Sequence, residues 1–145
     1  MSRAALSAAL DREIDRWCRE PMRWGIDDCA LSAANVIRQA LGYDPAEAWR
    51  ASHGTRDEAY RVVGRMGLGF AVRRVARAYG WGPIAPEQAD VGDIGLIMQD
   101  GRPCVVICKA RGWFMGRSET GASLLPVENT ANPCMSVRIA WSVLP

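Results

Sequence analysis

The sequence predicts an α+β fold in which N-terminal helices pack on a C-terminal antiparallel sheet. Apolar residues recur at helical spacing through roughly the first 80 residues. After Asp90, short strand-like segments alternate with turn residues. Asp100-Gly101 stands between two of these segments and is a strong hairpin signal. A group of helices followed in the sequence by an antiparallel sheet is typical of the α+β fold class.

The helical half contains four predicted helices. They cover residues 3–18, 28–41, 55–66 and 72–79. Pro21 follows the first helix and Gly42 stops the second. Thr55 and Glu58 form a capping box that opens the third, which the two glycines of residues 67–69 are expected to break. Small alanines on the apolar face of the second helix favour close packing against a neighbour.

The second half contains five predicted strands. They are residues 94–98, 104–108, 113–115, 123–125 and 137–141. Residues 80–86 are rich in glycine and proline and are expected to form a loop. The sequence contains no repeat or internal boundary, so we expect residues 1–145 to form a single domain.

Bulk composition excludes several classes of function. The net charge of +2 is too small to indicate a nucleic-acid partner. No apolar run approaches the roughly 20 residues of a membrane span. Charges at residues 11–13 interrupt the N-terminal apolar segment, so we expect no signal peptide and synthesis in a cytoplasm. The five cysteines are then expected to be reduced thiols.

The segment Trp24-Gly25-Ile26-Asp27-Asp28-Cys29 is the most informative in the chain. It places Cys29 on the first turn of an apolar helix, with Asp27 or Asp28 available as the cap. A helix N-terminus favours the thiolate, which is the nucleophilic form of cysteine. Cys29 is therefore a candidate nucleophile. The alternative is a small buried residue of the core.

This segment resembles the nucleophile region of NlpC-type, papain-like cell-wall peptidases. A second landmark, Gly92-Asp93, resembles the family's entry to its first core strand. The resemblance implies a papain-like NlpC-type fold in which the next strand opens with the catalytic histidine. Cys104 stands at that position here. A third polar group would follow near residues 115–116, where nothing suitable stands; Ser118 and Glu119 are close but are expected to form a turn.

His53 is the single histidine and the only candidate base. It lies in a polar loop, where a solvated imidazole is the simpler interpretation. Without a base, Cys29 could still form a thiolate but could not deliver a proton to a leaving amine. The resemblance therefore implies a pseudoenzyme. The alternative that stays open is an active cysteine peptidase or amidase that cuts peptidoglycan.

The whole chain also resembles a small phage-encoded branch of this superfamily that lacks the histidine. Leu124-Leu125-Pro126 and Ala140-Trp141-Ser142-Val143 carry that part of the resemblance. It implies a structural protein at the tail tip or baseplate hub of a phage or gene-transfer agent. The partners would be other tail-tip and hub proteins, and peptidoglycan is a further candidate. The alternatives are an active peptidase used during genome delivery and a cytoplasmic tail-assembly factor.

Other signals favour no cofactor and no metal. Cys104 and Cys108 share a strand face but lie about 13 Å apart, too far to chelate one ion. An arginine-rich helix face at residues 73–77 is either solvated or bound by a protein. The loop 80–86, which carries Trp81, and the apolar run 137–145 are the expected contact surfaces.

Overall fold

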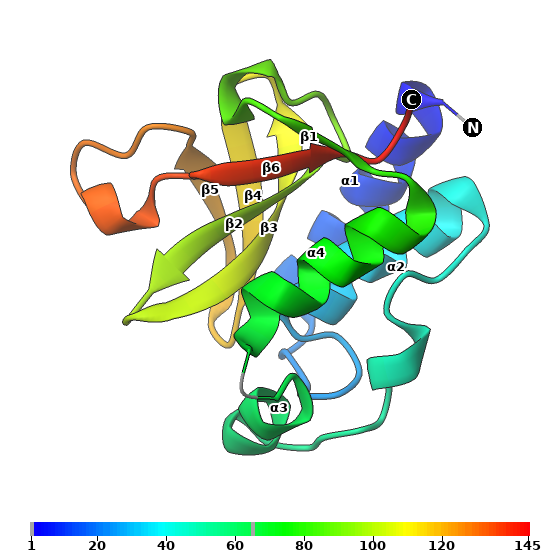
Figure 1. The fold of residues 1–145 in the computed structure, drawn as a ribbon, viewed down its shortest axis with the longest axis vertical. Helices are drawn as coiled ribbons and strands as arrows, with labels where there is room; N and C mark the ends of the chain where they lie inside the picture. The colour runs from blue at the N-terminus through cyan, green and yellow to red at the C-terminus, as the bar shows by residue number, and fades with distance from the viewer. Residues whose placement is uncertain (1, 65) are drawn as a thin grey trace.

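The computed structural model describes residues 2–64 and 66–145 and has the predicted α+β architecture (Figure 1). Its helices are α1 (Arg3–Arg19), α2 (Cys29–Leu41), α3 (Arg56–Val62) and α4 (Gly67–Tyr79). Its strands are β1 (Gly82–Ile84), β2 (Ile94–Gln99), β3 (Arg102–Ala110), β4 (Trp113–Ser118), β5 (Gly121–Pro126) and β6 (Ile139–Ser142). No helix among the described residues combines the length and apolar character that crossing a membrane requires.

The six strands form one antiparallel sheet in the order β1-β6-β2-β3-β4-β5. The β2–β3 hairpin turns at Asp100 and Gly101, with φ of 52° and 74°. Positive φ at both positions is the two-residue turn expected from that dipeptide. Cys104 follows this turn near the start of β3, and it lies beside Cys29 at the start of α2.

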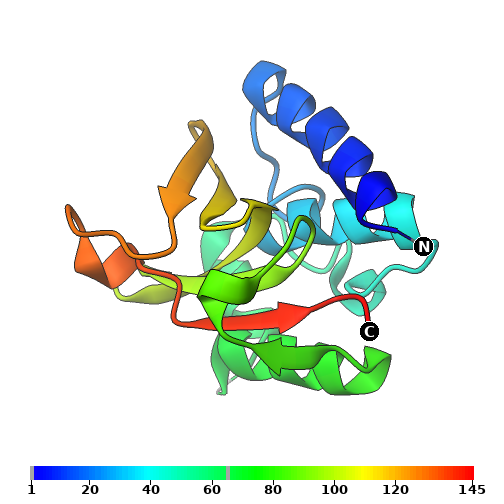
Figure 2. The same cartoon turned by 90° about the horizontal axis from the view of Figure 1, so that it is seen from above.

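The two faces of the sheet are covered differently. Helices α1, α2 and α4 cover one face, where Leu10, Trp17 and Ile37 pack with Val105 and Ile107. Each large apolar side chain buried there contributes about 1.5–3 kcal/mol relative to exposure. The chain between β5 and β6, orange in Figures 1 and 2, closes the other face. Its valines pack on the second core, away from the helices.

The Gly92-Asp93 landmark joins the start of β2 to both ends of the chain. Gly92 has φ of 93°, and a Cβ there would lie 2.8 Å from the Leu6 side chain, so only glycine fits. The buried Asp93 carboxylate accepts hydrogen bonds from Arg3 and from the Val143 backbone N–H. Figures 1 and 2 accordingly show the two termini at the same end of the molecule.

Three expectations from the sequence are wrong. Gly67 is the first residue of α4 and Gly69 lies in its first turn, so they begin a helix rather than break one, and α3 already ends at Val62. Residues 82–84 form β1 rather than a loop, because Pro83 lies on an edge strand and needs no ladder N–H.

The tryptophans of the two expected contact surfaces lie in the core. Trp81 is 7% exposed, and its indole N–H donates to the Tyr43 hydroxyl at 2.8 Å. Val137, Trp141 and Val143 are buried, and β6 lies between β1 and β2. The aromatic residues in these segments therefore stabilise the domain rather than offer a contact surface.

Candidate functional site

Cys29 is the first residue of α2, and Asp28 is its N-cap. The Asp28 Oδ1 accepts a hydrogen bond from the Leu31 backbone N–H at 3.2 Å, which satisfies one of the free donors of the helix end. The thiol therefore lies at the positive end of the α2 dipole, as the sequence predicts.

The Cys29 thiol forms a hydrogen bond with the Cys104 thiol. That hydrogen bond, burial and the nearby Asp28 carboxylate raise the pKa of Cys29 well above its usual value, so the expectation that the helix N-terminus favours a Cys29 thiolate is wrong. The same hydrogen bond lowers the pKa of Cys104. The two thiols thus titrate as a pair, which releases its first proton readily and its second reluctantly. The close approach of Cys29 and Cys104 is the arrangement expected from their places in the sequence.

His53 is not a solvated loop histidine. Its side chain is only 6% exposed, and its Nε2 lies 2.6 Å from Oδ2 of Asp28. Its Nδ1 lies 3.0 Å from the Ser52 hydroxyl. The carboxylate that caps α2 therefore also orients the imidazole. Among the contacts of the described residues, neither ring nitrogen bonds to the Cys29 thiol.

The Trp-Gly step of the motif explains why His53 is buried. The Ala51 N–H donates to the Gly25 carbonyl at 2.8 Å, which holds the histidine loop against the nucleophile loop. A Cβ on Gly25 would lie 1.9 Å from the His53 carbonyl oxygen, so no other residue permits this approach. The neighbouring Trp24 donates from its indole N–H to Glu119 at 3.2 Å. Glu119 lies in the turn after β4 as expected, but Ser118 is the last residue of β4 rather than part of that turn.

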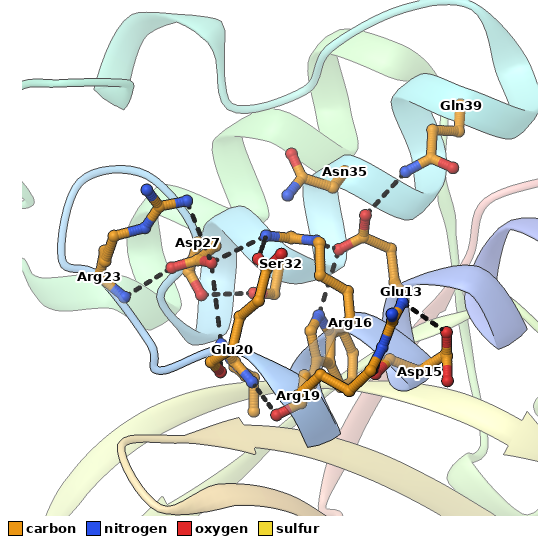
Figure 3. A network of polar contacts seen from close by, with 12 residues as sticks. Glu13, Asp15, Arg16, Arg19, Glu20, Arg23, Asp27, Ser32, Asn35 and Gln39 are labelled. Atoms are coloured by element: carbon orange, nitrogen blue, oxygen red, sulfur yellow. Dashed lines mark hydrogen bonds and ion pairs between the residues drawn. The ribbon is translucent and has the colours of Figure 1, made fainter.

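Asp27 does not cap α2; it lies in a buried polar network (Figure 3). Its Oδ2 accepts from Arg16 at 2.9 Å, and its Oδ1 accepts from the Arg23 backbone N–H at 2.6 Å. Burial acts to lower the pKa of Arg16, but its bonds to Glu13 and Asp27 outweigh burial and raise it. This network attaches the nucleophile loop to α1.

Arg117 is the site-lining residue that the sequence reasoning missed. It lies on β4, close to the position where the family's third polar group would fall, and its side chain is fully buried. The guanidinium donates to the carbonyls of Trp17 and Glu20 at 2.5 and 2.8 Å, and it lies 3.7 Å from Asp27. Burial lowers the pKa of Arg117, although Asp27 opposes the shift. Its place two residues after Met115, on the helix-covered face of the sheet, was the available signal.

A cleft of about 350 Å³ opens over these groups. Cys29, Cys104 and His53 are among the residues that line it. Its remaining walls are mostly apolar side chains of α2, α3 and α4, with the start of β3. Among the described residues, no group of three or more His, Cys, Asp or Glu side chains could hold a metal ion.

Comparison with known proteins places the chain. A family model, Domain of unknown function (DUF6950), matches residues 1–143. The chain belongs to this family. No curated protein matches it. Among solved structures, the crystal structure of the NlpC/p60 domain of the peptidoglycan hydrolase SagA is similar, with a TM-score of 0.51 and 19% identity. The match covers 94% of this chain and 97% of that chain.

At this identity the likeness establishes the fold and nothing more. The DUF6950 chain has the papain-like NlpC-type fold that its two short motifs indicated. Its cleft contains a thiol at a helix N-terminus and an imidazole oriented by a carboxylate. These are two parts of a cysteine hydrolase, but each part is bonded to a different partner.

Proposed function

We propose that this DUF6950 protein descends from an NlpC/p60-type peptidoglycan hydrolase and is itself catalytically inactive. The observation that carries the proposal is the pairing of the Cys29 thiol with Cys104. Peptide cleavage needs an imidazole that removes the thiol proton and returns it to the leaving amine. The chain has one histidine, and both of its ring nitrogens bond to other groups.

We further propose that the protein is a structural component at the tail tip or baseplate hub of a phage or gene-transfer agent. The support comes from sequence: the Trp-Gly-x-x-Asp-Cys segment, the Leu124-Leu125-Pro126 step and the Ala140–Val143 ending resemble a tail-encoded branch. The protein would be made in the bacterial host cytoplasm and bind other tail-tip and hub proteins, with peptidoglycan as a further ligand.

Mass spectrometry of purified particles tests the location. A structural protein is expected to remain in particles at a constant ratio to the other tail proteins. Its absence from particles, together with abundance in the lysate, would overturn the structural role and establish an assembly factor instead.

The variant Cys104→His tests the catalytic part of the proposal. An imidazole beside Cys29 should favour the thiolate and raise the rate of Cys29 alkylation by iodoacetamide at pH 7 about tenfold. Cys104→Ala is the matched control, because it removes the thiol without adding a base. Equal alkylation rates in the two variants would show that position 104 is not the vacated base position.

A second candidate is an active cysteine peptidase with His53 as the base. The Asp28–His53 pair favours it, because the imidazole lines the same cleft as Cys29 and is oriented by a carboxylate. Movement of the histidine loop would have to bring a ring nitrogen to the thiol. Peptidoglycan hydrolysis that disappears in both Cys29→Ala and His53→Ala would establish this function.

A further inference from the structure

The five cysteines differ in their surroundings. Cys18 and Cys134 are exposed, and Cys108 is buried in the second core. Cys29 and Cys104 are each partly exposed, line the same cleft and form a hydrogen bond with one another. The chain thus holds one pair of hydrogen-bonded thiols whose residues line the same cleft.

We propose that Cys29 and Cys104 form a thiol–disulfide exchange site that reacts with small disulfides of the glutathione class and closes to an intramolecular disulfide. This inference is independent of hydrolysis, because it uses the two thiols and no base. The small disulfide is the oxidant, and it reaches the two cysteines through the cleft that they line.

The chemistry proceeds in two exchange steps. The Cys104 thiolate attacks one sulfur of the small disulfide, forms a mixed disulfide and releases one thiolate. The Cys29 thiol then loses its proton to solvent, attacks the Cys104 sulfur and expels the second thiolate. Both thiolates take up protons from water. In total, two protein thiols and one disulfide become one protein disulfide and two small thiols.

The arrangement assigns the order of attack. The hydrogen bond with Cys29 lowers the pKa of Cys104, which favours the thiolate on Cys104 first. Once Cys104 is in the mixed disulfide, its negative charge no longer opposes ionisation of Cys29. Cys29 is already in hydrogen-bonding contact and can act as the resolving thiol. Disulfide formation then joins the N-terminus of α2 to the start of β3.

The test uses the full chain with Cys18→Ser and Cys134→Ser, so that exposed thiols do not react. The reduced protein is incubated with oxidised glutathione, the remaining thiols are alkylated, and peptides are mapped by mass spectrometry. We expect a Cys29–Cys104 disulfide, two glutathiones released per chain, and free Cys108. The oxidised protein should melt about 5 °C or more above the reduced protein, because the bond closes a long loop.

Single variants in the same background separate the two roles. Cys29→Ser should retain a stable mixed disulfide on Cys104, whereas Cys104→Ser should form little mixed disulfide on Cys29 in the same time. Circular dichroism confirms that each variant is folded. Two free thiols at positions 29 and 104 after incubation, or glutathione on both without a bond between them, would overturn the proposal.

Discussion

Asp27 and Asp28 are neighbours in the sequence and both carboxylates are buried, but they bind different partners. Asp27 faces α1 and β4, where Arg16 and Arg117 surround it. Asp28 faces the cleft, where it caps α2 and bonds to His53. One residue of sequence thus separates a carboxylate that holds the fold together from one that organises the candidate site.

The difference teaches that burial and charge alone do not identify a functional carboxylate. Asp27 is the more buried of the two and has the stronger cationic surroundings, yet its partners are structural. Asp28 touches the imidazole and adjoins the thiol, so it controls the chemistry available in the cleft. Mutations should therefore separate stability from reactivity at adjacent positions.

Asp27→Ala is expected to have the largest effect. It leaves the buried Arg117 without its nearest carboxylate and removes one of the carboxylates that bind Arg16, and breaking a buried ion pair in this way costs about 3–5 kcal/mol. Urea unfolding followed by tryptophan fluorescence measures the loss. Asp15→Ala is the control, because the Asp15–Arg19 pair is exposed and should contribute less than about 0.5 kcal/mol. Similar losses in both variants would contradict the structural role of Asp27.

Asp28→Ala should destabilise less but change the thiol. Loss of the helix cap and of the His53 partner should cost about 2–3 kcal/mol. Asp28→Asn retains a capping oxygen and should cost about 1 kcal/mol. Both variants remove a negative charge beside Cys29, so the pKa of Cys29 should fall toward its usual value. Thiol alkylation against pH measures this, and an unchanged profile would argue against contact between Asp28 and the site.

Cys108, which lies outside the candidate site, should make a smaller contribution to stability that depends on pH. Burial raises the pKa of Cys108 to about 12. Because the pKa is raised in the folded state, the stability that the Cys108 thiol contributes is fully present below the unfolded-state pKa of about 8.5. This stability is lost as the pH rises toward 12. Cys108→Ala should therefore lose about 1–2 kcal/mol less stability than wild type between pH 8 and 10. Parallel stability curves for the two proteins would contradict this assignment.

Much of the fold could be predicted because local patterns and tertiary packing agree. The apolar spacing of α1 and the Asp100-Gly101 turn each specify their own structure. Strand β1 could not be predicted, because a Gly-Pro step on its own favours a loop and becomes a strand here only by pairing with β6, which is distant in the sequence. The glycines at the start of α4 also favour a loop when the local sequence is considered alone. Packing against the sheet, rather than helix propensity, sets where that helix begins.

The site was predictable where it depended on motif order and unpredictable where it depended on loop packing. Cys29 and Cys104 come together because the fold places the start of α2 beside the start of β3, and the sequence motifs mark both starts. The burial of His53 depends on contact between its loop and Gly25, which sequence spacing does not reveal. Arg117 escaped notice because its partners are backbone carbonyls at the end of α1, distant in the chain.

The most direct test of the account measures the release of soluble peptides from purified peptidoglycan by the reduced wild-type protein, with Cys29→Ala as the control. The account predicts that both proteins release no more than buffer, because neither ring nitrogen of His53 bonds to the Cys29 thiol. Release by the wild type that is absent from Cys29→Ala would contradict the central claim and show that the cleft is an active hydrolase site.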